Sequence, residues 1–206
     1  MPQFTTSLDL LALTAVLAYL LGSVPFGIVF ARLFGLGDLR KIGSGNIGAT
    51  NVLRTGSKPA AFLTLVMDAG KGGIAVLIAR AFLAEDAVQV AGLFAFLGHL
   101  FPIYLRFKGG KGVATFLGTI LALAFPVGLA ACATWVVTAA LFRYSSLAAL
   151  IAALSSPIWA TVLDWRTTTL LCVILAQFIF LRHRSNVERL FARTEPKIGQ
   201  KSKAKT

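Results

Sequence analysis

The sequence predicts an all-α, polytopic integral membrane protein, and three observations support this class. Of its 206 residues 57% are hydrophobic and 14% are charged, with a mean hydropathy of +0.79, whereas a soluble domain is nearer half apolar and a quarter charged. The apolar residues form long runs without strict alternation, which favours helices over a membrane β-barrel. The runs lack the polar faces that a soluble helical bundle needs.

The first apolar run, residues 8–34, predicts a retained transmembrane helix. No Lys or Arg precedes the run and no small-residue cleavage pattern follows it, which argues against a signal peptide. Pro25, in the segment GSVPFG, predicts a kink or an unwound turn. A polar loop, residues 35–58, comes next.

Further apolar runs predict the remaining spans. Pro59 suits the first turn of the second one. The runs cover residues 60–83, 87–104, 113–124, 127–141, 147–163 and 167–180. Residues 113–141 are compatible with one broken crossing, two short crossings or a re-entrant pair.

The distribution of basic residues favours two crossings or a re-entrant pair for residues 113–141. Either arrangement puts all of the 20 Lys and Arg residues except Lys71, Arg80 and Arg166 on one side. The positive-inside rule then predicts about seven transmembrane helices, with the N-terminus out and the C-terminus in. Residues 1–193 form the single membrane domain, and the basic residues 194–206 are expected to be a disordered tail.

The net charge of +12 has two possible interpretations. In a soluble chain it would suggest a nucleic-acid partner, but here it predicts basic loops on one face of the bilayer. We expect no nucleic-acid partner. Cys132 and Cys172 fall within apolar runs without metal-ligand spacing and are expected to be packing residues.

Residues 43–54, GSGNIGATNVLR, cannot bury an apolar face but can present backbone N–H groups to an anion. The pattern Gly43-x-Gly45-x-x-Gly48 also matches the dinucleotide fingerprint. That fingerprint needs a βαβ unit, and here a membrane span precedes it. The alternative to an anion site is an ordinary flexible loop.

Residues 108–112, KGGKG, resemble a phosphate loop but are not a Walker A motif, because Gly112 follows Lys111. The alternative is a basic turn that orients the helices. The alternation of Gly and Lys, followed by Thr115, favours anion binding.

Three ionisable side chains fall inside predicted spans. Asp68 and Lys71 share one helical face, and charges in a span mark either function or a structural pair. His99 is expected to be a packing residue. Past the last span, His183 lies within RHRSNVER, where it can take a proton from a hydroxyl or bind a phosphate.

Together these segments resemble the bacterial acyl-phosphate:glycerol-3-phosphate acyltransferase family. The resemblance covers nearly the whole chain up to Arg193 and rests on several motifs in order. The motifs are GSVPFG from Gly22, GSGNIGATNVLR from Gly43, Asp68-x-x-Lys71-Gly, Gly98-His-x-Phe-Pro, KGGKGVAT from Lys108 and Arg182-His-Arg-x-Asn186.

The resemblance implies a multi-pass enzyme of the bacterial inner membrane with a cytoplasmic active site. It would transfer a fatty acyl group from acyl phosphate to the sn-1 hydroxyl of glycerol 3-phosphate, giving lysophosphatidic acid and inorganic phosphate in the first acylation of phospholipid synthesis. No cofactor and no metal are implied. The oligomeric state stays open, a monomer included.

The expected site residues fall into three groups. Those with expected catalytic roles are Ser44, Arg54, His183 and Asn186. Those expected to bind substrate phosphate are Gly43, Gly45, Asn46, Gly48, Thr50, Asn51, Lys71, Lys108, Gly109, Gly110, Lys111, Gly112, Thr115 and Arg182. Those expected to be structural are Asp68, His99 and Glu188. The general base is either His183 or the phosphate of the donor.

Acyl phosphate is already activated, so positioning and charge stabilisation suffice for direct attack by a hydroxyl. A transporter of a phosphorylated solute is the first alternative, but the polar residues gather in loops. A metal-dependent phosphatidyltransferase would need a cluster of carboxylates, and a purely structural protein would not need three polar loops on one face.

Overall fold

The computed structural model describes residues 5–200, and all regular elements in that range are helical. The α-helices are α1 (Leu8–Ser23), α2 (Phe26–Leu33), α3 (Ala49–Leu53), α4 (Lys58–Phe82), α5 (Glu85–Leu100), α6 (Val113–Leu123), α7 (Phe125–Phe142), α8 (Ser145–Val162), α9 (Thr169–Arg182) and α10 (Arg184–Phe191). Short 3-10 turns are η1 (Leu39–Lys41), η2 (Ile103–Leu105) and η3 (Arg166–Thr168). The predicted all-α class is confirmed.

Within residues 5–200, five helical stretches are long and apolar enough to cross a membrane, namely Leu8–Leu33, Lys58–Phe82, Glu85–Leu105, Phe125–Phe142 and Ser145–Val162. The helices Arg166–Arg182 and Arg184–Phe191 meet this criterion only when taken together as one span, which is bent by 64°. Helix α6 has 11 residues, which at 1.5 Å per residue reach about half of a hydrocarbon core. The ambiguous segment is therefore one short helix followed by one full-length helix.

The expected break near Pro25 is confirmed, since α1 ends at Ser23 and α2 begins at Phe26. Lys71 on α4 donates a hydrogen bond from Nζ to the carbonyl of Val24, at 2.8 Å. A helix interrupted by Pro leaves backbone groups that need other partners in an apolar environment. Lys71 therefore supplies a donor at the break.

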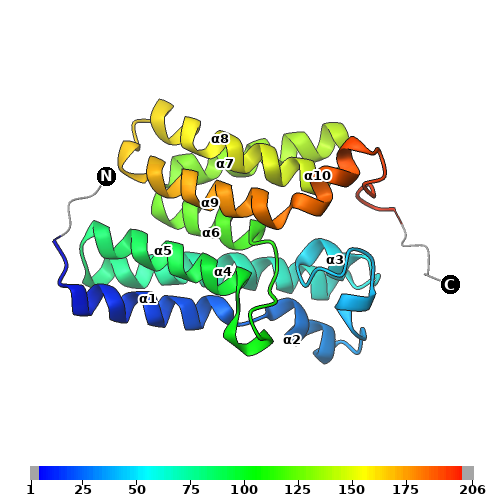
Figure 1. Cartoon of the computed structure of the whole chain (residues 1–206), viewed down its shortest axis with the longest axis horizontal. Coiled ribbons are helices and arrows are strands. Elements are labelled where there is room, and N and C mark those ends of the chain that lie inside the picture. The colour runs from blue at the N-terminus through cyan, green and yellow to red at the C-terminus, as the bar shows by residue number, and fades with distance from the viewer. Residues whose placement is uncertain (1–4, 201–206) are drawn as a thin grey trace.

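Two layers of helices make up the molecule (Figure 1). Helices α1, α4 and α5 form one layer, α7, α8 and α9 form the other, and α6 lies between them. Glycines bring backbones together in the first layer, because a Cβ on Gly22 would lie 2.0 Å from the Ala95 carbonyl oxygen. A Cβ on Gly118 of α6 would likewise lie 2.1 Å from the carbonyl oxygen of Ala69 on α4. Small residues at such crossings are typical of membrane helix packing.

The main apolar core lies where α5, α6 and α9 meet, with Phe96, Phe116, Ile120 and Leu175 fully buried. Many large apolar side chains on the outside are exposed, as lipid-facing residues would be. The polar loop before α4, the glycine-rich turn before α6, the start of α8 and α10 all gather at the end of the bundle opposite the start of α1.

The segment after α10 differs from the sequence expectation of a disordered tail. Glu195 is buried, and the backbone N–H of Ile198 donates to the carbonyl of Arg143 at 2.7 Å. Composition alone did not reveal this, because a few specific polar contacts fix the segment. Residues 201–206 of the expected tail lie outside the described residues.

Candidate active site

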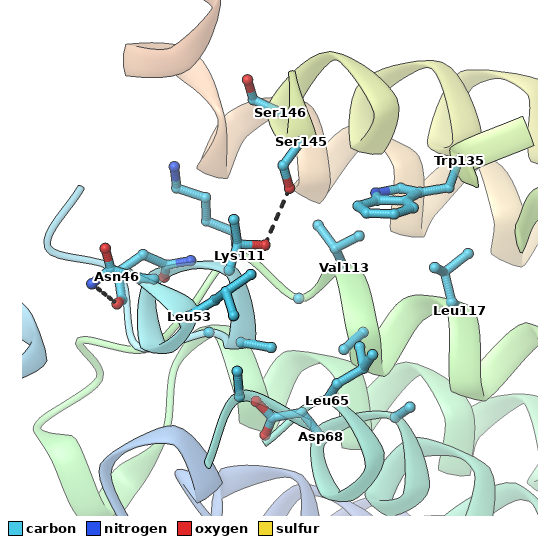
Figure 2. A pocket seen from close by; sticks show the side chains of 18 of the residues that line it. Asn46, Leu53, Leu65, Asp68, Lys111, Val113, Leu117, Trp135, Ser145 and Ser146 are labelled. Atoms are coloured by element: carbon cyan, nitrogen blue, oxygen red, sulfur yellow. Dashed lines mark hydrogen bonds between the residues drawn. The ribbon is translucent and has the colours of Figure 1, made fainter. Parts of the chain in front are cut away.

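A cavity of about 600 Å³ opens at the polar end of the bundle and continues between the helices. Its lining comes from the first polar loop, α4, α6, α7, the start of α8, α10 and Glu195. Figure 2 shows these side chains converging, with Asp68 and Leu65 on α4, Val113 and Leu117 on α6, and Trp135 on α7. Polar groups line the end of the cavity at the loops, and apolar groups line most of the remainder.

Asn51 organises the first polar loop from within. Its Nδ2 shares its two hydrogens among the carbonyls of Leu39, Ile42 and Asn46, which lie at 2.9, 3.0 and 2.7 Å. Its Oδ1 accepts from the backbone N–H of Ser44 at 3.1 Å. The loop also contains glycines with positive φ, which allow its tight turns. The side-chain amide of Asn51 and these turns together determine the conformation of the loop beside the cavity.

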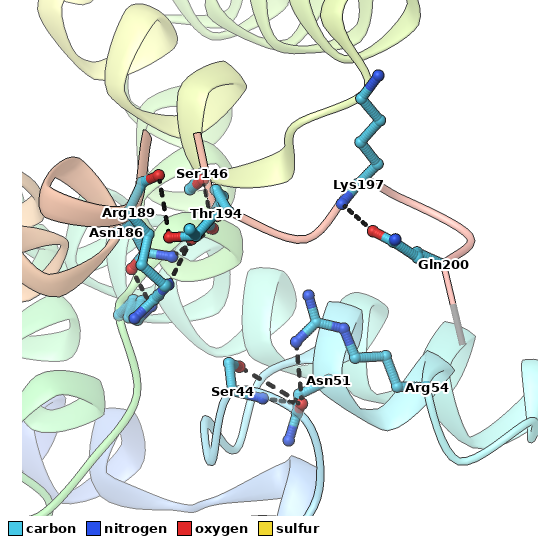
Figure 3. A network of polar contacts seen from close by, with 11 residues as sticks. Ser44, Asn51, Arg54, Ser146, Asn186, Arg189, Thr194, Lys197 and Gln200 are labelled. Atoms are coloured by element: carbon cyan, nitrogen blue, oxygen red, sulfur yellow. Dashed lines mark hydrogen bonds and ion pairs between the residues drawn. The ribbon is translucent and has the colours of Figure 1, made fainter. Parts of the chain in front are cut away.

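Arg54 follows α3 and points its guanidinium toward the same loop, with Nη1 3.5 Å from Oδ1 of Asn51 (Figure 3). The side chain is partly buried. Burial lowers the pKa of Arg54, and the negative charge of Glu195 opposes that shift. Arg54 remains a cation, because an arginine titrates far above neutral pH.

The glycine-rich turn, residues 108–112, is clamped from two sides. On one side the N–H groups of Gly109 and Gly110 donate to the carbonyls of Leu100 and His99 at 3.2 and 3.1 Å. On the other, Arg182 donates from Nη2 to the Gly109 carbonyl at 2.8 Å and from Nε to the Gly110 carbonyl at 3.1 Å. The guanidinium of Arg182 therefore holds the turn in place.

Lys111 extends from this turn into the cavity, where Nζ donates to Oδ1 of Asn186. The pKa of Lys111 is lowered to about 8, mainly by burial; the charge of Glu195 opposes this shift, and the charges of Arg189, Arg54 and Arg182 contribute to it. A substrate phosphate beside Nζ would favour the charged ammonium group, since an opposite charge raises the pKa of a lysine.

Glu195 joins the start of α8, α10 and the C-terminal segment. Its Oε1 accepts from Ser146 Oγ at 2.7 Å and from Asn186 Nδ2 at 2.6 Å, and its Oε2 accepts from Arg189 Nε at 2.7 Å. Burial alone would raise the pKa of Glu195, but hydrogen bonds from these three side chains bring it below its usual range. The carboxylate fixes the amide of Asn186, so that Oδ1 faces Lys111.

His183 lies just past α9 and is buried. Its Nδ1 lies 2.8 Å from the carbonyl oxygen of Ile179. A carbonyl only accepts, so the neutral ring carries its proton on Nδ1 and leaves Nε2 as an acceptor. Burial, followed by the charge of Lys111, lowers the pKa of His183 to about 4, which keeps the ring neutral at physiological pH.

The apolar half of the cavity is a groove with α6 as its floor and α4 and α7 as its walls. Its deeper lining residues are Leu65, Ala69, Leu117, Gly118, Leu121, Cys132, Trp135 and Val136. Phe62 and Val136 on its edges remain 64% and 58% exposed. The groove therefore opens to the lipid-facing surface of the bundle and suits a long apolar chain.

Most residues expected at the site line the cavity. Those are Ser44, Asn46, Gly48, Thr50, Asn51, Arg54, Asp68, His99, Lys111, Gly112, His183 and Asn186. Those that lie outside its lining, as far as residues 5–200 show, are Gly43, Gly45, Lys71, Lys108, Gly109, Gly110, Thr115, Arg182 and Glu188. Glu188 forms an exposed ion pair with Arg184, at 3.5 Å.

Sequence reasoning missed the apolar lining of the groove and several polar lining residues. Glu195 lies in a segment whose composition predicts disorder, and Ser145, Ser146 and Trp135 sit at the ends or in the middle of apolar runs without a motif. Ser145 Oγ and Thr50 Oγ1 lie 3.2 Å apart, so the start of α8 meets the first polar loop across the cavity mouth. Only the folded arrangement shows these neighbours.

The arrangement provides cations and a neutral imidazole at one end of a lipid-open groove. Such a site can bind a phosphate-bearing amphiphile, with its headgroup among the cations and its chain between the helices. It can also bring a second, polar phosphate compound to the same cations.

Comparison with known proteins identifies the same kind of molecule. The family model described as glycerol-3-phosphate acyltransferase matches residues 12–193. A glycerol-3-phosphate acyltransferase of Jannaschia sp. (strain CCS1) is 68% identical over 201 residues, covering 98% of this chain and 99% of that protein. One from Cereibacter sphaeroides (strain ATCC 17029) is 63% identical, covering 98% and 100%.

Solved structures give the same result. The crystal structure of PlsY (YgiH), an integral membrane glycerol 3-phosphate acyltransferase, in its glycerol 3-phosphate form superposes with a TM-score of 0.87 and 38% identity, covering 92% of this chain and 96% of that one. Its lysophosphatidic acid form gives a TM-score of 0.85 and 37% identity, covering 92% and 95%. By sequence over nearly its whole length and by fold, this chain belongs to the family of integral membrane glycerol-3-phosphate acyltransferases.

Proposed function

We propose that the protein transfers a fatty acyl group from acyl phosphate to the sn-1 hydroxyl of glycerol 3-phosphate. The products are lysophosphatidic acid and inorganic phosphate, and the reaction is the first acylation of phospholipid synthesis. The observation that carries the proposal is the joined cavity, in which a cationic polar end continues into an apolar groove open to lipid. Two phosphate-bearing substrates, of which one carries an acyl chain, match this division.

Lys111 and Arg54 provide the charge for the two phosphates, with the loop at Ser44 and Asn46 beside them. Glycerol 3-phosphate is assigned to the side of the glycine-rich turn, where Lys111 enters the cavity. Arg182 and Lys71, which the sequence suggested as phosphate ligands, are assigned to support, because they lie outside the cavity lining and donate to backbone carbonyls.

In the reaction the sn-1 hydroxyl oxygen attacks the acyl carbonyl carbon, and the bond between that carbon and the phosphate oxygen breaks. The released phosphate takes the proton of the hydroxyl. His183 Nε2 accepts a hydrogen bond from the hydroxyl and orients it. Lys111 and Asn186 face the developing negative charge, and such preorganised donors stabilise a transition state without an enzymic nucleophile.

The site is assigned to the cytoplasmic face of the bacterial inner membrane. The chain traverses the bundle with α1–α2, α4, α5, α6, α7, α8 and α9 in turn, so α1 begins at the end opposite α10. Together with the basic residues gathered at the α10 end, this supports seven traverses with the N-terminus out and the C-terminus in. No cofactor is required by this chemistry.

The test uses the purified protein in lipid with glycerol 3-phosphate and a synthetic acyl phosphate. Phosphate release and lysophosphatidic acid are followed together, with a chelator present and with acyl-CoA as a parallel donor. We expect one phosphate per acylated product from acyl phosphate alone. Activity with acyl-CoA alone would overturn the donor assignment, and uptake of a phosphorylated solute into vesicles without acylation would overturn the reaction.

A further inference from the structure

Three ionisable side chains are buried together between α4 and α5, and two of them, Asp68 and His99, also line the cavity. Asp68, Lys71 and His99 are 1%, 2% and 5% exposed. Oδ1 of Asp68 lies 2.9 Å from Nζ of Lys71 and 3.5 Å from Nδ1 of His99. Charged groups inside a membrane bundle are costly and persist where they are paired or have a task. Lys71 donates a hydrogen bond to the backbone at the α1–α2 break. The proposed reaction, in contrast, assigns no role to His99.

The other edge of the His99 ring rests on the glycine-rich turn. A Cβ on Gly110 would lie 2.2 Å from Nε2 of His99 and 3.1 Å from both neighbouring ring carbons. The imidazole therefore fills the space where a side chain of residue 110 would be. The backbone conformation of residue 110 does not itself call for a glycine, because the glycine with positive φ in this turn is Gly112. The space occupied by the His99 ring is therefore the reason that residue 110 has no side chain.

The backbone of His99 holds the same turn, because its carbonyl accepts the N–H of Gly110 at 3.1 Å. Arg182 holds the turn from the opposite side through the carbonyls of Gly109 and Gly110. Lys111, the next residue, projects its ammonium group into the cavity. The ring is thus a spacer between a fixed carboxylate on α4 and the turn that carries Lys111.

We propose that His99 is a positioning residue for Lys111. The carboxylate of Asp68 lies against one edge of the imidazole. The opposite edge sets the position of Gly110 relative to α5, and Gly110 in turn sets where the ammonium group of Lys111 meets the phosphate of glycerol 3-phosphate. The identity of that phosphate rests on the proposed function. The steric contact between His99 and Gly110 exists whether or not that function is correct.

The first measurement is binding of glycerol 3-phosphate by calorimetry without acyl donor, together with the KM for each substrate. His99→Ala should weaken binding of glycerol 3-phosphate and raise its KM by about tenfold or more, because misplacing a positioned charge costs that much. His99→Gln, which keeps a polar group against Asp68, should restore most of the affinity. The KM for acyl phosphate should change less than the KM for glycerol 3-phosphate in both variants.

The sharper experiment is a double-mutant cycle. Gly110→Ala should weaken binding because its methyl group meets the His99 ring, and adding His99→Ala should relieve that part of the loss. Gly109→Ala is the matched control, because a Cβ there would lie 2.2 Å from the backbone carbonyl oxygen of His99, which His99→Ala leaves in place. We expect strong coupling for residues 99 and 110 and additivity for residues 99 and 109.

Additive losses in both pairs, or an unchanged affinity in His99→Ala, would overturn the positioning role. Equal coupling energies in both pairs would mean that the substitutions loosen the whole glycine-rich turn, and this result would also overturn the positioning role of His99. Thermal unfolding of each variant identifies those that fail to fold, and His99→Gln and Gly110→Ala then carry the comparison. If the wild type binds glycerol 3-phosphate but transfers no acyl group, the proposed reaction is refuted. The coupling energies of the double-mutant cycle can still be interpreted in that case, because they are measured by binding.

Discussion

Lys111 is the cavity cation whose charge changes within an accessible pH range, because the pKa of its ammonium group is lowered to about 8. As pH rises through this value the free enzyme loses the proton and with it the attraction for a phosphate dianion. We expect kcat/KM for glycerol 3-phosphate to fall about tenfold between pH 7 and pH 9, since kcat/KM reports the free enzyme. The measurement is a pH profile at a concentration of acyl donor well below its KM, so that the donor site is mostly empty.

Lys111→Arg is the matched variant, because an arginine stays charged throughout this range. Its profile should be flat above pH 7, while Lys111→Ala should raise the KM for glycerol 3-phosphate by roughly 10- to 100-fold at pH 7. The same alkaline fall in Lys111→Arg would assign the titration to another group.

The buried ring of His183 offers Nε2 as an acceptor to the substrate hydroxyl. His183→Ala should lower kcat by roughly a hundredfold, with a smaller change in either KM, because an oriented acceptor acts mainly in the transition state. The pKa of about 4 also predicts no acid limb near pH 6.5 from this ring. A loss confined to KM would make His183 a binding residue instead.

At the residue scale the motifs predicted most of the polar lining, since Gly, Asn, Arg and Lys in short loops indicate anion binding wherever the loops lie. They could not distinguish ligands from supports. Lys71 and Arg182 carry the same charge as Lys111, but only the fold shows that their donors bind the carbonyls of Val24, Gly109 and Gly110.

At the scale of elements, α7 forms the wall that limits the apolar groove. Cys132 lines the groove, while its neighbour Ala133 is exposed on the outside of α7. Cys132→Phe should lower kcat/KM for long acyl phosphates about tenfold relative to short ones, because the ring takes up groove volume. Ala133→Phe adds the same ring toward lipid and should leave the preference unchanged. Equal losses at every chain length in Cys132→Phe would contradict the groove assignment.

The helices themselves were largely predictable, because apolar runs bounded by Pro, Gly and charged residues define them. The break at Pro25 and the start of α4 near Pro59 follow from the chemistry of proline. Helix α10 was not foreseen, since its polar sequence RSNVERLF is helical only in the context of its contacts with α8 and α9.

At the scale of the whole molecule, the C-terminal segment contributes Glu195 to the lining of the cavity. A chain ending at Gln200 should keep its activity, whereas a chain ending at Arg193 should lose activity and unfold at lower temperature, because it leaves Ser146, Asn186 and Arg189 without Glu195. Glu195→Ala should cost about 3 kcal/mol of unfolding free energy, the scale for breaking a buried charge network. Unchanged thermal unfolding in both variants would contradict this role.

The pKa of Glu195 lies below its usual value, so its contribution to stability is complete above the unfolded pKa and is lost as pH falls through the folded one. The wild type should therefore lose stability on acidification, and Glu195→Ala should lose less of it. Thermal unfolding in lipid over acidic pH measures the difference between the two.

The orientation of the whole bundle is testable by labelling single cysteines in a background without Cys132 and Cys172. Ser57→Cys and Ser185→Cys should react only from the cytoplasmic side, and Asp164→Cys, in the exposed turn between α8 and α9, only from the outside. Labelling of the first two from outside would reverse the topology. The distribution of basic residues in the sequence predicted this orientation. The length of α6 became clear only from the structure, because an apolar segment that forms an 11-residue helix is compatible with several arrangements.

The exposed edges of the groove, Phe62 and Val136, have a kinetic consequence. A substrate whose chain enters between them is dissolved in the bilayer, so the enzyme meets it in two dimensions. Its effective concentration is then a mole fraction of the surrounding lipid and is independent of the volume of the aqueous phase. Glycerol 3-phosphate, in contrast, arrives from water and obeys an ordinary molar scale. The two Michaelis constants of one site therefore carry different units.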